Sequence, residues 1–180
     1  GSGSLTIDYS VRRDGANMDL ATAPQWTAPS GASRLAITVG WSSPDYTNEG
    51  ASTPAQPMSL NGLDVGGAVT DNLDGTYTVV ATLPSSASGT ATVAMEGHPA
   101  ADLDGDATYS DQLPIANTYE HVALSGGRAE PFIREDVIDM DKCNACHDAA
   151  GQGLSLHGNN RTGEMQTCVV CHNADATDID

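Results

Sequence analysis

Aromatic residues, basic residues and long apolar runs are all scarce in this chain. Among 180 residues there are two Trp, five Tyr and one Phe, which excludes a core built mainly from large rings. Lys and Arg together number 7 against 24 Asp and Glu, giving a formal charge of −17. Such a field makes nucleic acid and anionic lipid surfaces poor partners. No run is long and apolar enough to predict a membrane-spanning helix.

Gly, Ala, Ser, Thr and Asp dominate instead, so any core of this chain is thin. Residues 139–180 contain no aromatic residue at all and cannot form a hydrophobic core alone. A bound apolar cofactor would supply the missing bulk there. The strong acidity would attract cationic or metallic electron acceptors, although it can equally serve solubility alone.

All four cysteines lie in two Cys-x-x-Cys-His motifs, at 143–147 and 168–172. This pattern is the attachment sequence of a c-type haem, in which two thioethers hold the porphyrin and the histidine binds iron. Residues three apart share one face of a helical turn, so both thiols of a motif can reach one porphyrin edge. The sequence therefore predicts two haem c groups, attached at Cys143, Cys146, Cys168 and Cys171, with proximal ligands His147 and His172.

Two other interpretations of the cysteines compete with haem. Two Cys-x-x-Cys pairs 21 residues apart also match a zinc ribbon, which needs only the four thiolates. Disulfides are compatible with an oxidising compartment. Both interpretations leave the two adjacent histidines unexplained, so haem is favoured.

The first two-thirds of the chain alternates apolar and polar residues in short runs. Runs at 5–11, 34–39, 76–83 and 89–95 are rich in β-branched residues and predict strands. Asn-Gly and Asp-Gly pairs between them predict turns. We therefore expect a mainly β chain, with an antiparallel, immunoglobulin-like β-sandwich or barrel over 5–124. Residues 1–4 read as a linker or flexible N-terminus, and 125–180 as a mostly irregular and helical dihaem segment.

Alternating carboxylates occur in one predicted turn of this β region. Asp102, Asp104 and Asp106 have a spacing that can converge on a calcium ion. They lack the distal bidentate Glu of an EF-hand. An ordinary acidic turn is therefore the favoured interpretation, and calcium the alternative.

The dihaem segment is expected to hold two short helices. One begins near 139–141, carries 143–147 and ends by 151, and the other runs from about 163 through the second motif. Leu154 to Arg161 reads as a polar turn region between them. Low-spin haems require a second strong axial ligand. His157 is the best distal candidate because Gly158 allows the backbone to approach a porphyrin closely.

Two histidines of the β region are candidates for the other distal position. His98 is expected in a loop after a strand and is slightly favoured because a loop can adjust to an iron. His121 is expected on a strand. Methionine ligation, which would raise the potential, is an alternative at Met18, Met58, Met95, Met140 and Met165.

The segments 142–148, 154–162 and 167–173 together resemble the outer-surface multihaem c-type cytochromes of metal-reducing bacteria (the OmcA/MtrC type). The resemblance covers roughly 134–180. It implies β-barrel-like domains beside haem domains, and bis-histidine ligation with His157 in a Leu-x-Leu-His-Gly element. Family members carry many more haems than two, so the chain is expected to be a piece of a larger cytochrome or a reduced relative.

The sequence thus predicts an electron-transfer protein and not an enzyme. The resemblance implies extracellular minerals of iron or manganese, flavins or other cytochromes as redox partners. We expect an extracytoplasmic location, at the outer-membrane surface or in the periplasm, because haem is attached covalently outside the cytoplasm. Two alternatives stay open. One is a peroxidase or terminal reductase with an open iron site, for which Glu96, Asp102 and Arg161 are available, and the other is a zinc-ribbon adhesion module.

Overall fold

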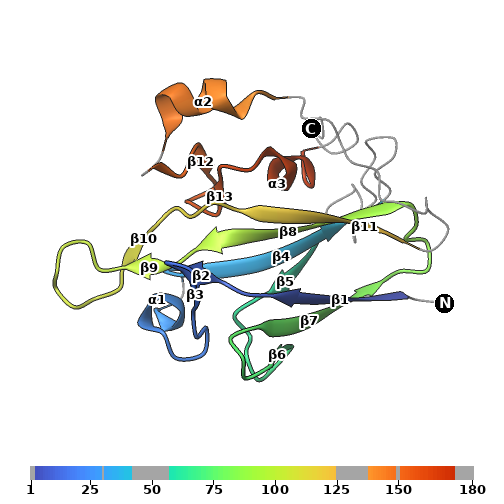
Figure 1. Cartoon of the computed structure of the whole chain (residues 1–180), viewed down its shortest axis with the longest axis horizontal. Helices are drawn as coiled ribbons and strands as arrows, with labels where there is room; N and C mark the ends of the chain where they lie inside the picture. Colours follow the sequence, from blue (N-terminus) through green and yellow to red (C-terminus); the bar gives the residue numbers. More distant parts are fainter. Residues whose placement is uncertain (1–2, 30, 42–56, 125–137, 149–150, 173–180) are drawn as a thin grey trace.

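The computed structural model describes residues 3–29, 31–41, 57–124, 138–148 and 151–172, and Figure 1 shows their arrangement. The chain is mainly β, as the alternating patterns predict. Its sheets are antiparallel, and no sheet of the described residues closes on itself.

The larger sheet has the strand order β11-β8-β4-β5. Its strands are β4 (Arg34–Gly40), β5 (Met58–Asn61), β8 (Thr90–His98) and β11 (Thr118–Ala123). β8 lies at the centre with β4, and its register on that strand pairs Met95 with Ile37. The predicted runs 34–39 and 89–95 are confirmed as the two central strands.

The second sheet has the order β1-β7-β6. It contains β1 (Gly3–Tyr9), β6 (Val69–Asp71) and β7 (Tyr77–Leu83). Along β7, buried residues from Tyr77 to Leu83 alternate with more exposed ones such as Val80. This alternation shows a sheet with one face in the core and one face toward solvent.

Both sheets contribute to a single hydrophobic core. Ile37 and Val39 enter it from β4, and Tyr77 and Val79 enter it from β7. Trp41 is 1% exposed and Trp26 is 3% exposed, so the two tryptophans supply bulk that the small residues cannot.

The strands β4 and β8 are buried on both faces. Nearly all residues of the two strands are buried, which indicates that each face is covered. Alternation places Thr92, Ala94 and Glu96 on the face opposite the shared core. That outer face is covered by the C-terminal segment, since α3 (Met165–Val169) and β13 (Arg161–Thr162) both contact β8.

Several short elements complete the β region. They are β2 (Arg12–Arg13), β3 (Ala16–Asn17), α1 (Pro24–Thr27), β9 (Ala100–Ala101) and β10 (Asp111–Gln112). β2 pairs with β3, and β9 with β10. The one-turn helix α1 was not expected. It begins at a proline, a residue favoured in the first helical turn, and buries Trp26.

The C-terminal segment lies along the outer face of the four-stranded sheet (Figure 1). It holds α2 (Met140–His147), the hairpin β12 (Ser155–Leu156) with β13, and α3. None of the described helices is long and apolar enough to cross a bilayer. Residues 125–137, which begin the predicted dihaem segment, lie outside the described residues.

The first helix is confirmed, since α2 begins at Met140 and ends at His147, before the expected limit at 151. Two expectations about local structure require correction. The region from Leu154 to Arg161 is a hairpin and not only a polar turn. His98 is the last residue of β8 and not a loop residue, because it continues the pairing of β8 with Arg34 on β4.

Candidate cofactor-attachment site

The second motif forms a helical turn that continues beyond α3. Glu164 caps α3 by accepting a hydrogen bond from the Gln166 amide at 2.9 Å. The Cys168 carbonyl then accepts from the Cys171 amide at 3.1 Å and from the His172 amide at 2.9 Å. These two bonds bring the thiols and the imidazole of the motif into one turn, as the spacing predicts. Neither cysteine of this motif is joined in a disulfide.

Burial sets the protonation of these thiols. It raises the pKa of Cys168 and of Cys171 above the ordinary value, and the nearby Arg161 guanidinium offsets part of the rise. Burial also acts to lower the pKa of Arg161. The hydrogen bond to Glu96, together with electrostatic attraction from Cys171, Glu96 and Cys168, outweighs burial and holds the pKa of Arg161 above its usual range. Both thiols are therefore protonated at neutral pH, unlike thiolates prepared as metal ligands.

His157 lies at the tip of the β12–β13 hairpin, which pairs Ser155 with Thr162. The tip has a left-handed backbone at three successive residues, with φ of 55° at His157 and 63° at both Gly158 and Asn159. Left-handed backbone is unfavourable for a residue with a Cβ unless surrounding contacts impose it. His157 is exposed, so its imidazole is presented outward from a constrained loop.

The imidazole rings of His157 and His172 lie close together. Their centroids are 6.1 Å apart and their planes make an angle of 36°. His157 comes from the hairpin and His172 from the end of the second motif, 15 residues later. The structure therefore brings the predicted distal histidine beside one of the two predicted proximal histidines.

The first motif lies on α2, which packs on the loop that follows it. Asn144 accepts a hydrogen bond from the Leu154 amide at 2.8 Å, and Asp148 accepts one from the Gly153 amide at 2.7 Å. No α2 residue is buried, and His147 is exposed. Cys143 is half-buried and Cys146 exposed. This motif is therefore more open to solvent than the second one.

The other two candidate histidines belong to the β region. His98 is 2% exposed, and burial lowers its pKa. His121 on β11 approaches the Thr92 hydroxyl through Nδ1 at 3.0 Å and packs edge-on against Tyr119, with 5.1 Å between the ring centroids. Both histidines therefore belong to strands of the four-stranded sheet and not to the C-terminal segment.

A buried ion pair connects the second motif to the sheet. Glu96 on β8 has a side chain that is 2% exposed, and it accepts a hydrogen bond from Arg161 Nε at 2.5 Å. Arg34 lies 3.6 Å from the other oxygen of the carboxylate, with a half-exposed side chain. The sequence makes Glu96 and Arg161 available as acid–base groups beside an open iron. Their geometry is that of a mutually satisfied pair.

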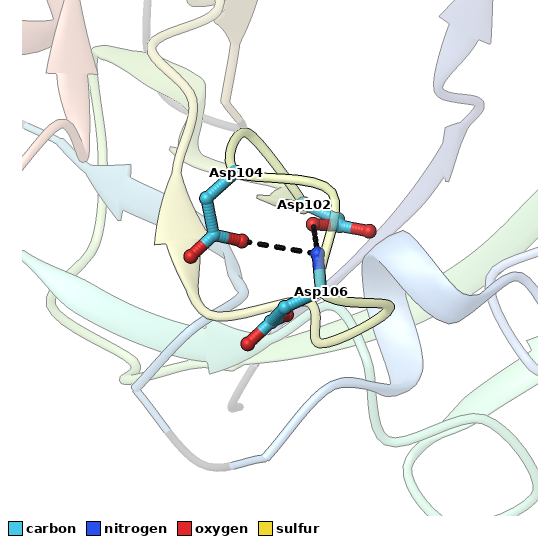
Figure 2. Close-up of side chains that lie close together, drawn as sticks. All are labelled: Asp102, Asp104 and Asp106. Atoms are coloured by element: carbon cyan, nitrogen blue, oxygen red, sulfur yellow. Dashed lines mark hydrogen bonds between the residues drawn. The ribbon is translucent and has the colours of Figure 1, made fainter.

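The acidic turn brings its three carboxylates within 4.8 Å of one another (Figure 2). Asp102 accepts hydrogen bonds from the amides of Gly105, Asp106 and Ala107, and Asp104 accepts one from Asp106. These bonds are typical of aspartate in a tight turn. Among the residues described, this is the one group of three or more ligand-type side chains close enough to hold a metal ion.

Asn117 is a site residue that sequence reasoning missed. It precedes β11, and its side chain bonds to the backbone of the hairpin at Asn160 and Thr162. No periodicity or motif marks an isolated asparagine 40 residues before the hairpin tip, so the sequence gives no local signal for this contact.

Comparison of the chain with protein-family models, curated proteins and solved structures finds no match. The function is therefore inferred from the residues and their geometry.

Proposed function

We propose that this protein transfers electrons through two covalently attached c-type haems. Cys143 and Cys146 would hold the first, with His147 as a ligand. Cys168 and Cys171 would hold the second, with His172 as its proximal and His157 as its distal ligand. When bound, each haem supplies a one-electron iron couple whose potential depends on its ligands, hydrogen bonds and exposure.

The observation that carries the proposal is the 6.1 Å separation of the His157 and His172 rings. An imidazole nitrogen lies about 2 Å from a coordinated transition metal and its ring centre about 1 Å further, so opposite rings on one ion lie about 6 Å apart. The observed separation agrees with this value. These two side chains therefore suit a shared iron, and the two cysteines of the second motif belong to the same turn as His172.

The arrangement of the cysteines supports haem over zinc. A zinc ribbon needs four thiolates at one point. In the part of the chain that the structure describes, the four thiols form no group of three or more metal-ligand atoms. Each pair is instead followed by its own exposed histidine, as separate attachment of two haems requires.

The remaining parts of the proposal concern the β region and the setting of the protein. Two antiparallel sheets with a common core suit a β-sandwich scaffold. We propose an extracytoplasmic location, because thioether attachment takes place there. Cationic or mineral acceptors, flavins or other cytochromes are the proposed redox partners, and the acidic surface disfavours nucleic acid.

Intact mass of the exported protein tests the proposal, using an expression host that attaches c-type haem. We expect a mass equal to the polypeptide plus two haems, and a Soret band that survives acid–acetone extraction. A double variant, Cys168→Ala with Cys171→Ala, should carry one haem. A colourless protein with the mass of the polypeptide alone would overturn the proposal.

A further inference from the structure

We propose that Asn117 of the β region is a positioning residue that holds His157 at the second haem iron. The inference depends on the proposed function, because it assigns a role toward that haem. It would make the β-sheet region part of the haem site, since the ligand on the hairpin would be held in place from the sheet.

Asn117 acts on the hairpin as an additional strand would. Its backbone amide donates to the Thr162 carbonyl at 2.9 Å, and its side-chain oxygen accepts from the Thr162 amide. Its side-chain amide also donates to the Asn160 carbonyl at 3.2 Å. One residue thereby satisfies three backbone groups of the hairpin, which is the role of a paired strand.

Asn160 carries this restraint to the histidine. Its carbonyl accepts a second hydrogen bond, from the Gly97 amide of β8 at 2.8 Å. Its own side-chain amide donates to the His157 carbonyl at 2.6 Å. A continuous series of hydrogen bonds therefore runs from the four-stranded sheet, through Asn160, to the backbone of His157.

The opposite side of the tip is held as well. Asn159 donates to the Gln112 carbonyl of β10 at 2.9 Å, and its side-chain oxygen accepts from the Ser155 hydroxyl at 3.0 Å. The left-handed run that starts at His157 is costly unless external contacts determine it. These contacts, with the Glu96–Arg161 pair at the start of β13, hold the tip in its left-handed conformation.

The test is Asn117→Ala in the full-length holoprotein, with Asn72→Ala as the matched control. Asn72 also makes side-chain hydrogen bonds, to Thr76 and Thr78, but in a turn of the other sheet. The readouts are the haem count by intact mass, the high-spin absorption of the ferric protein and its response to added imidazole. We expect Asn117→Ala to keep two haems but to convert one of them to high spin. Free imidazole at millimolar concentration should restore the low-spin spectrum, and Asn72→Ala should match the wild type.

A second variant keeps the test decisive if the alanine variant is not recovered. Asn117→Asp retains an acceptor for the Thr162 amide but cannot donate to Asn160, so it should also gain high-spin haem. Either variant with two haems and a wild-type spectrum would overturn the positioning role alone. A wild-type protein without haem would instead overturn the proposed function, so the two failures are distinct.

Discussion

His157 has a backbone conformation that its own side chain disfavours. An L-residue in the left-handed region costs about 1 kcal/mol relative to its preferred conformations, and φ at His157 is 55°. Glycine would occupy this position without that cost. Backbone preference alone therefore does not select a histidine here, which agrees with the proposed role of its imidazole.

Replacing His157 by alanine and by glycine separates the backbone from the imidazole. Both variants lose the proposed ligand, so each should gain one high-spin haem to the same extent. The glycine variant should be more stable than the alanine variant by about 0.5–1 kcal/mol, because only alanine retains a Cβ in left-handed backbone. Urea denaturation of the two variants measures the difference. Equal spectra without any high-spin component would remove His157 from the iron.

At the scale of residues, the sequence predicts the attachment site better than its supports. The cysteines and proximal histidines form local motifs whose chemistry is contained in five residues. The glycine beside His157 marks it as a candidate ligand, but nothing in the sequence indicates that its ring lies beside that of His172. Asn117 and Glu96 contact the hairpin from 40 or more residues away, and such contacts exist only once the chain has folded.

Among the elements, the long strands were predictable and the short ones were not. β7 and β8 carry seven and nine residues, enough for a period-two pattern to be recognised. β12 and β13 have two residues each, so no alternation can distinguish a hairpin there from an irregular turn. Their pairing is fixed by contacts with the sheet.

At Gly97, β8 passes very close to the backbone of β4. Its φ is 146°, and a Cβ there would lie 2.0 Å from the Arg34 carbonyl of β4. Gly97→Ala should therefore force β4 and β8 apart and weaken the bond from Gly97 to Asn160. We expect a loss of stability above about 2 kcal/mol, measured by thermal or urea unfolding. Gly3→Ala, which meets no atom within 4 Å, should be nearly neutral, and equal effects of the two would contradict this account.

For the whole molecule, the β region and the C-terminal segment are joined by the Glu96–Arg161 pair. Removing one partner of a buried pair leaves an uncompensated charge and costs about 3 kcal/mol or more. Arg161 is 15% exposed in this pair, whereas Arg34 is 49% exposed in its own contact with Glu96. Arg161→Met should therefore destabilise the protein by about 3 kcal/mol or more, and Arg34→Met by less than about 1 kcal/mol. Denaturant midpoints of the two variants measure the contrast, and similar midpoints would refute it.

The charge of −17 should act on electron exchange over longer range. Oxidation of the reduced protein by a cationic ruthenium hexaammine should slow as salt is added, because attraction is screened. Oxidation by anionic hexacyanoferrate should speed up. Stopped-flow rates over a range of ionic strength provide the measurement. Salt effects of the same sign with both reagents would show that the surface charge does not steer the encounter.

The alanines and threonines on the outer face of β4 and β8 suit an order of assembly in which the proposed haem is attached before the C-terminal segment docks. Cys168 and Cys171 are half-buried while their segment is docked, so an attachment enzyme would reach them more easily before docking. Undocking of that segment would expose methyl and hydroxyl groups of Ala36, Thr38, Thr92 and Ala94. It would not expose a large hydrophobic patch of the kind that drives self-association. The undocked protein would therefore resist aggregation before the proposed haem is attached.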